Sequence, residues 1–326
     1  MDKHKKTMNS PLIINRNWIS NNRTHLMGIG ILLVVLFHTY CTFGRVFMPF
    51  CYGYTGVDIF MLVSGFGLCR SYESNKLHTF YSHRIKRVMP LFIVYALLRS
   101  LLYVLDGTEV TLCDLILNLS TLSYYGIGGQ FMDWYLCSSL LLYLLFPLFY
   151  KIIRRVGMLA VFCSIVACCL MYYLYPDIEW QFRCLISRIP VFLLGIAIYL
   201  PHFEIEWQKG RYDLCIYIFL LICAIYLRQD NFLIGALLIY PILLIASIYD
   251  KQLCLFKTNS YAQSVIIYMG KHSLQIYIAN CLMMYSITII LCDYYSKFWN
   301  LIIYSIGHFI LILILNAITN KLQKHC

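Results

Sequence analysis

Long apolar segments separated by short polar connections constrain the fold of this chain more than any other feature. The first is HLMGIGILLVVLFHTYC, residues 25–41, in which a dozen apolar residues precede His38. Segments of about 20 apolar residues match a helix that crosses the ~30 Å hydrocarbon core of a bilayer. Of the 326 residues, 61% are hydrophobic and 13% are charged, which excludes a soluble class because a soluble protein needs far more polar surface. The sequence predicts an all-α integral membrane protein.

Ten membrane-spanning helices are predicted from these segments. They are expected at residues 26–43, 54–72, 88–105, 134–152, 157–175, 185–200, 212–227, 231–249, 273–294 and 298–319. Lysine and arginine recur in every second connection, whereas the connection 106–133 contains neither. Because cytoplasmic loops retain basic residues, this alternation predicts that both termini are cytoplasmic. Residues 1–326 are expected to form one membrane-embedded domain, with its core at about residues 20–320.

The net charge of +11 and the 15 cysteines raise the question of nucleic-acid, metal or disulfide chemistry. In a protein with many spans, basic residues retained on the cytoplasmic side explain the charge, so no nucleic-acid partner is expected. Most of the cysteines lie within apolar segments, and none forms a CxxC pair or a Cys/His spacing typical of zinc sites. Free cysteine in such places packs as a small apolar residue, and no metal is expected.

Two ionisable residues lie within the first two predicted spans. His38 is about five residues from the outer end of the first span, and Asp58 is about five residues below the start of the second. Ionisable side chains are costly in a membrane, so they usually face the bundle interior and are functional candidates. A carboxylate beside a histidine fixes its tautomer and stabilises the imidazolium, as a general base requires. We therefore expect His38 and Asp58 to pair. The alternatives are a structural interhelical hydrogen bond for His38 and a helix-start or loop-facing carboxylate for Asp58.

The segment FYSHRIKRVMP, residues 80–90, brings two arginines to the predicted cytoplasmic entry of the third span. Arg84 and Arg87 are about one helical turn apart and precede Pro90. Two guanidinium groups on one helix face can hold phosphate groups by paired hydrogen bonds, so this pair is a candidate phosphate site. The alternative is that the two arginines only anchor the helix at the cytoplasmic surface.

Three more residues near span ends are candidates of a weaker kind. Trp134 follows Asp133 at the outer mouth of the fourth span, Arg188 lies just inside the sixth, and Tyr277 belongs to the segment MGKHSLQIYIANCL that opens the ninth. Interfacial aromatic residues usually form the aromatic belt of a membrane protein. An arginine near a helix end can extend its charge to the interface.

The order of these segments and their amino-acid sequences resemble those of the integral-membrane acyltransferase 3 family, the bacterial O-acetyltransferases of surface polysaccharides. The run LMGIGILLVVLFH is similar to the opening of that family, and GVDIFMLVSGF is similar to its second motif. Arg84, Arg87 and Pro90 match an R-x-x-R pair that leads into a proline. Further matches are Trp134–Pro147, Arg188–Gly195 and Gly270–Tyr277. The resemblance covers about residues 20–320.

The sequence departs from this family at two positions. An arginine that the family has eleven positions before the histidine falls on Met27, and a histidine that often follows the late IY motif falls on Asn280. Arg23 lies about one helical turn before Met27 and about 40° further round the helix, and its long side chain could cover the ~6 Å between the turns. We hypothesise that Arg23 takes the role of the missing arginine.

The resemblance implies an enzyme that moves an acetyl group from cytoplasmic acetyl-CoA to a hydroxyl of a cell-surface polysaccharide or lipid-linked glycan. His38 would be the general base, although a covalent acyl-histidine step is a second possibility. The residues expected at the site are His38 and Asp58 for catalysis, Arg84, Arg87 and Arg23 for acyl-CoA, and Ser64, Trp134, Arg188 and Tyr277 for the substrate or the oxyanion. No bound cofactor is expected besides acetyl-CoA as donor. The implied location is a bacterial cytoplasmic membrane, crossed many times and surrounded by lipid, with the oligomeric state open.

Two other functions stay open at the level of the sequence. A transporter or flippase for a lipid-linked sugar would use His38, Asp58 and Arg188 to line a polar path. A non-catalytic member of the family would account for the departures at Met27 and Asn280. Transfer or hydrolysis of acetyl-CoA by the purified protein separates an enzyme from both.

Overall fold

The computed structural model describes residues 13–128, 133–201, 205–206, 218–219, 222, 237, 239, 243, 261–287 and 297–323. The secondary structure of these residues is helical apart from one short antiparallel pairing of β1 (Ile13–Ile14) with β2 (Ile205–Glu206). The helices are α2 (Arg16–Phe43), α3 (Thr55–Ser74), α4 (Leu77–Leu105), α5 (Leu112–Leu119), α6 (Trp134–Val156), α7 (Met158–Leu174), α8 (Trp180–Tyr199), α11 (Tyr261–Lys271), α12 (Ser273–Tyr285) and α13 (Lys297–Gln323), with the short 3₁₀ helices η1 (Arg45–Phe50) and η2 (Leu122–Tyr125). The predicted all-α class is confirmed at this level.

Six helices in the described part of the chain are long and apolar enough to cross a membrane. They are Arg16–Phe43, Val46–Ser74 (which joins η1 to α3), Leu77–Leu105, Trp134–Val156, Trp180–Tyr199 and Trp299–Lys321. Each overlaps one of the ten predicted spans, because a long apolar run can satisfy its backbone in lipid only as a helix. Arg16–Phe43 and Leu77–Leu105 begin well before the spans predicted at 26–43 and 88–105.

The other four predicted spans have different outcomes. Residues 157–175 form α7, which is a shorter apolar helix. Residues 273–294 begin with α12, and their end lies outside the described residues. The spans predicted at 212–227 and 231–249 lie for the most part outside the described residues. The cytoplasmic placement of both termini stays a prediction, since residues 1–12 and 324–326 also lie outside them.

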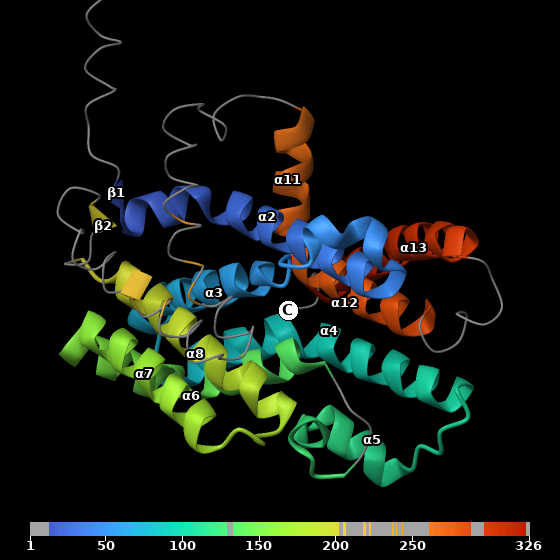
Figure 1. Cartoon of the computed structure of the whole chain (residues 1–326), viewed down its shortest axis with the longest axis horizontal. Helices are drawn as coiled ribbons and strands as arrows, with labels where there is room; N and C mark the ends of the chain where they lie inside the picture. Colours follow the sequence, from blue (N-terminus) through green and yellow to red (C-terminus); the bar gives the residue numbers. More distant parts are fainter. Residues whose placement is uncertain are drawn as a thin grey trace, which may run out of the picture.

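Helix α3 lies at the centre of the bundle and packs against α2, α6 and α8 (Figure 1). It buries every residue from Thr55 to Val63, and α8 buries every residue from Pro190 to Tyr199. Helices that are apolar on all sides need such central positions. A Cβ on Gly195 of α8 would overlap the carbonyl oxygen of Leu62, so a glycine there allows the two backbones to approach closely, as is common between membrane helices.

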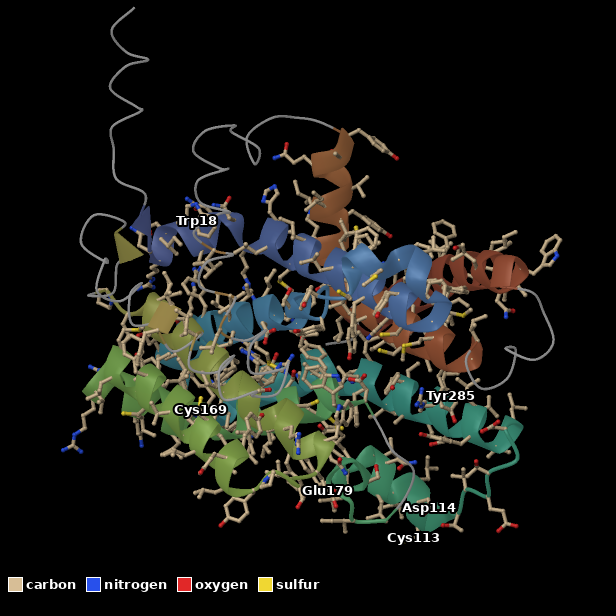
Figure 2. All side chains as sticks on the ribbon, viewed as in Figure 1. Trp18, Cys113, Asp114, Cys169, Glu179 and Tyr285 are labelled. Atoms are coloured by element: carbon tan, nitrogen blue, oxygen red, sulfur yellow. The ribbon has the colours of Figure 1, made fainter. Side chains whose placement is uncertain are left out.

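The remaining described helices complete two sides of this centre. Helices α6, α7 and α8 pack together on one side, and α12 contacts α2, α4 and α13 on the other. In Figure 1, α11 stands upright against α2 while the long helices run across the picture. Apolar side chains fill the spaces between the ribbons (Figure 2) and form one large buried cluster. Most residues discussed below come from the region where α2, α3, α4, α6 and α12 meet, and the others come from α8, α11 and α13.

Candidate functional site

Two cavities meet at Tyr277 of α12. One is lined by Arg23, Arg84, Arg87 and Lys271 and is called the arginine cavity here. The other is lined by His38, Asp133, Trp134 and Arg99, among others, and is called the histidine cavity. Tyr277 belongs to the wall of both. Their volumes are about 180 Å³ and 300 Å³, so each can hold part of a larger molecule.

The arginine cavity collects four basic side chains from three helices. Arg84 and Arg87 come from neighbouring turns of α4, Arg23 comes from α2, and Lys271 ends α11. None of the described residues that line this cavity is Asp or Glu. The Nε atoms of Arg23 and Arg84 are buried and make no hydrogen bond within the described structure. Like charges held together without a counter-ion favour binding of an anion, and arginines favour phosphate in particular.

Arg23 reaches the cavity that Met27 also lines. Its guanidinium lies against Gly67 of α3, where even an added Cβ would touch the Nη2 atom. The absence of a side chain on Gly67 therefore leaves room for the guanidinium. Arg84 and Arg87 are close enough for their charges to act on Arg23. This geometry supports the hypothesis that Arg23 substitutes for an arginine at position 27.

His38 points into the other cavity and is held by α12. Its Nδ1 hydrogen-bonds the side-chain Oδ1 of Asn280, and the Nδ2 of Asn280 donates to the hydroxyl of Tyr304 on α13. Because an amide oxygen only accepts hydrogen bonds, Nδ1 of His38 carries the proton in this arrangement. The other ring nitrogen, Nε2, then has a free lone pair that can accept a proton.

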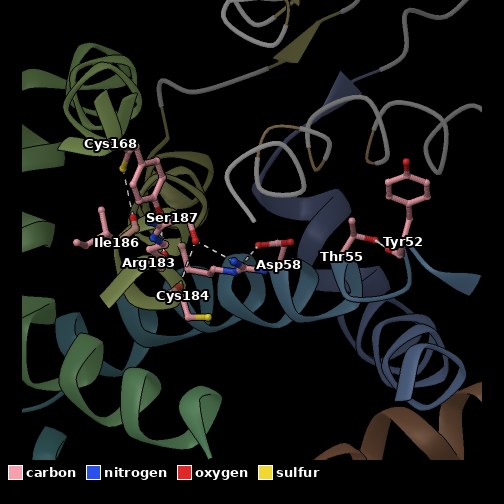
Figure 3. A network of polar contacts seen from close by, with 10 residues as sticks. Tyr52, Thr55, Asp58, Cys168, Arg183, Cys184, Ile186 and Ser187 are labelled. Atoms are coloured by element: carbon pink, nitrogen blue, oxygen red, sulfur yellow. Dashed lines mark hydrogen bonds and ion pairs between the residues drawn. The ribbon is translucent and has the colours of Figure 1, made fainter. Parts of the chain in front are cut away.

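Asp58 does not contact His38, which corrects the pairing expected from the sequence. Its Oδ1 lies 3.2 Å from the Nε of Arg188, and both side chains are completely buried between α3 and α8. The Nη1 of Arg188 donates to the hydroxyl of Ser187 at 2.8 Å. Figure 3 shows Asp58 on α3 and Ser187 on α8 with the ion pair between them. The two candidate residues do lie on adjacent helices, but similar depth does not fix the direction in which a side chain points. Asp58 is turned toward Arg188 of α8.

The carboxylate that faces the histidine cavity is Asp133. It caps the start of α6 by accepting hydrogen bonds from the backbone N–H groups of Tyr135 and Leu136 at 2.9 and 3.1 Å. It also accepts from the hydroxyl of Tyr277 at 2.8 Å, and its charge acts on the imidazole of His38. The sequence marked Asp133 only as part of an interfacial aromatic segment. An aspartate just before an apolar run is a helix-cap signal, but its proximity to His38 has no local signal.

The four residues expected at the substrate or the oxyanion separate into three places. Trp134 lines the histidine cavity, and Tyr277 lines both cavities. Ser64 lines the arginine cavity, where its hydroxyl accepts a hydrogen bond from Tyr143 at 3.3 Å. Arg188 belongs to neither wall; its guanidinium carbon lies 5.0 Å from the ring centroid of Trp134. Trp134 and Tyr277 are thus the two that remain near His38.

Arg99 was not among the expected site residues, yet it lines the histidine cavity. It lies on α4, twelve positions after Arg87. Its signal in the sequence is a single charged residue inside an otherwise apolar span, which by itself indicates a functional position. As for metals, no group of three or more His, Cys, Asp or Glu in the described chain could hold an ion.

The comparison with protein families agrees with this architecture. The family model described as an acyltransferase domain, that of the acyltransferase 3 family, matches residues 25–320. The match covers nearly the whole chain, so the chain belongs to this family and is a multi-pass membrane protein. Comparisons with curated proteins and with solved structures gave no significant match.

Proposed function

We propose that this protein is a membrane O-acetyltransferase that moves an acetyl group from acetyl-CoA to a hydroxyl of a cell-surface polysaccharide or lipid-linked glycan. One observation carries the proposal: a cavity lined by four basic residues and a cavity that contains His38 share Tyr277 as a common wall. A donor with a phosphorylated head and a long, thin, thioester-bearing arm matches this pair of cavities. Family membership supports acyl transfer as the reaction class.

The arginine cavity is the proposed site of the CoA phosphates. Arg23, Arg84 and Arg87 supply fork-shaped donors that suit phosphate oxygens, and Lys271 adds a fourth positive charge. On α4, Arg87 lies eight residues before Tyr95 and twelve before Arg99, both of which line the histidine cavity. The separation is about 12 to 18 Å at 1.5 Å per residue. The pantetheine arm would extend past Tyr277 and deliver the thioester carbonyl to His38.

His38 is the proposed general base. Its Nε2 takes the proton of the attacking sugar hydroxyl while that oxygen bonds to the thioester carbonyl carbon. The tetrahedral intermediate then collapses, the carbon–sulfur bond breaks, and the imidazolium returns its proton to the leaving CoA thiolate. Asn280 keeps the productive tautomer through Nδ1, and the negative charge of Asp133 stabilises the imidazolium. Trp134, which faces this cavity, is the candidate donor to the oxyanion, because the hydroxyl proton of Tyr277 is already donated to Asp133.

The proposed location is a bacterial cytoplasmic membrane, with the arginine cavity open to the cytoplasm. Acetyl-CoA is available on that side. The basic residues of the N-terminal segment and of the connection before α4 would then lie on the cytoplasmic side, as the positive-inside rule requires. The acceptor hydroxyl would approach His38 from the opposite side of the bundle.

Purified protein and radiolabelled acetyl-CoA test this function directly. The wild-type protein should release CoA and label a glycan acceptor, and His38→Ala should lower the rate by about 10²–10⁴-fold. His78→Ala is the matched control, because His78 is exposed on α4 and lines neither cavity. NMR of surface glycans from cells with and without the gene should show loss of an O-acetyl signal. Unchanged acetylation with His38→Ala would refute the base role, and no CoA release at all would favour a transporter or a non-catalytic protein.

A further inference from the structure

The histidine cavity contains a cation that the proposed reaction does not use. Arg99 lines this cavity together with His38. Tyr95, Tyr103 and Tyr285 act on it electrostatically, and Tyr103 also makes a side-chain hydrogen bond with it. No carboxylate forms an ion pair with it in the described chain. Its Nε is buried and has no hydrogen-bond partner there. A guanidinium inside a membrane span is costly. The carboxylate of Asp133 lines the same cavity, but it accepts hydrogen bonds from the start of α6 and from Tyr277. The guanidinium of Arg99 can therefore take an anionic ligand.

The way in which Arg99 is held leaves part of its hydrogen-bonding edge available, because Tyr103 takes one contact while Nε has no partner in the described structure. Its guanidinium carbon lies 3.4 Å from the ring centroid of Tyr285 and 5.2 Å from that of Tyr103. Tyr285, labelled in Figure 2, reaches α4 from α12. Stacking on aromatic rings occupies the face of a guanidinium and leaves its N–H donors, which lie in the plane, for a carboxylate or phosphate.

The rest of the cavity wall suits a saccharide. Trp134, Trp180 and Tyr54 contribute aromatic side chains beside His38. Pockets that combine aromatic walls with a few polar groups orient a ligand by the polar groups and exclude water by the walls. Arg99 is about 18 Å further along α4 than Arg87, so it cannot hold the same phosphates as the arginine cavity.

We propose that the acceptor is an anionic saccharide and that Arg99 pairs with its carboxylate or phosphate while His38 faces the hydroxyl to be acetylated. The proposal rests on the proposed acetyl transfer and adds the charge of the acceptor. The anion could be a uronic acid within the glycan or the phosphate of a lipid carrier. Both present the same chemistry to a guanidinium, and the acceptors described next distinguish them.

Matched acceptor pairs provide the test. Purified protein in detergent receives acetyl-CoA with methyl glucoside or methyl glucuronide, methyl galactoside or methyl galacturonide, and glucose or glucose 1-phosphate. Acetylated product is quantified by mass spectrometry. The acidic member of at least one pair should be preferred by about ten- to a hundredfold, since a charge-assisted hydrogen bond contributes that much. Preference for a uronide indicates a carboxylate acceptor, and preference for glucose 1-phosphate indicates a phosphate acceptor.

Variants of Arg99 separate recognition from packing. Arg99→Gln should bring the ratio of acidic to neutral product down to about one by lowering transfer to the acidic sugar, and Arg99→Lys should keep part of the preference. Arg154→Gln, at an exposed position on α6, is the control and should behave as wild type. A purely structural Arg99 would instead lower transfer to both members of a pair equally. Equal use of acidic and neutral sugars by the wild-type protein would overturn the proposal.

A binding measurement keeps this test independent of turnover. The melting temperature of the protein is recorded with each sugar in the absence of acetyl-CoA, because a ligand that binds only the folded state raises it. The acidic member of at least one pair should raise it more in the wild type and not in Arg99→Gln. If the proposed function is wrong, the protein should release no CoA, while the acidic sugar should still raise the melting temperature of the wild-type protein. Equal melting temperatures within every pair would overturn the role of Arg99.

Discussion

The two cavities on either side of Tyr277 share several helices in their walls but have different chemistry. The arginine cavity has four basic residues and no acidic residue among its described lining. The histidine cavity has one imidazole, one carboxylate and one guanidinium among aromatic and apolar side chains. Helices α2, α4 and α12 contribute to both walls. Along these helices, the basic residues of the arginine cavity and the imidazole of His38 therefore lie at different levels.

This contrast has a functional consequence within the proposed mechanism. Anchoring of a charged donor requires a high positive potential, which would oppose protonation of a nearby histidine. Placing the base about 16 Å along α2 from Met27, at 1.5 Å per residue, removes it from that potential. Substitutions in the arginine cavity should therefore change donor binding, and substitutions around His38 should change the chemical step.

The largest expected effect concerns a residue pair that belongs to neither cavity. Arg188→Met leaves the buried carboxylate of Asp58 without its partner and should lower the free energy of unfolding by about 3–5 kcal/mol. The double variant Asp58→Asn, Arg188→Met should recover most of the stability and retain acetyl transfer. Denaturant unfolding in detergent and the transfer assay measure both. A stable Asp58→Asn protein without transfer activity would show that Asp58 has the catalytic role expected from the sequence.

A substitution of Asn280 tests whether the histidine cavity controls the chemical step and not donor binding. Asn280→Ala removes the acceptor that fixes the tautomer of His38 and should lower kcat by about 10–100-fold, as loss of an orienting neighbour commonly does. The KM for acetyl-CoA should stay the same, because the donor is held elsewhere. Asn280→His, which restores the residue frequent in the family, should retain most activity because a ring nitrogen can accept the same bond. A rise in KM without loss of kcat would contradict this assignment.

Arg84 provides the converse test in the arginine cavity. Arg84→Gln should raise the KM for acetyl-CoA by about tenfold through the loss of a charge-assisted contact to phosphate, with kcat at saturation unchanged. Arg154→Gln changes the charge equally at an exposed site and should leave the KM as it is. An effect of Arg84→Gln on kcat alone would break the division between the two cavities.

The smallest expected effect tests the substitution of Arg23 for an arginine at position 27. Arg23→Gln should raise the KM for acetyl-CoA by about three- to tenfold. Adding Met27→Arg to that variant should restore the wild-type KM, since both side chains reach the same cavity. Steady-state kinetics of the wild type, the single variants and the double variant measure this coupling. Full activity of Arg23→Gln would refute the hypothesis.

Several residues of the candidate site could be predicted because short-range sequence patterns identify them. The one-turn spacing of Arg84 and Arg87 places both on one helix face, and both do line one cavity. The isolated histidine at the end of an apolar run marked His38. The partners of these residues could not be found in this way: Asn280 is 242 positions from His38, and Asp133 is 144 positions from Tyr277. Depth in the membrane alone led to the wrong partner for Asp58: it was expected to pair with His38 of α2, but its partner Arg188 lies on α8.

The sequence by itself determined that this chain is a multi-pass helical membrane protein of the acyltransferase 3 family, and where its long apolar helices and main charged motifs lie. Apolar length and local spacing carry that information because backbone hydrogen bonds must be satisfied within each helix in lipid. Only the tertiary structure decided which side chains meet. The rotation of each helix about its axis, and the choice of its neighbours, depend on the packing of several helices together. That packing directed Asp58 to Arg188, gave His38 its bond to Asn280, and brought Asp133 and Arg99 to the same cavity.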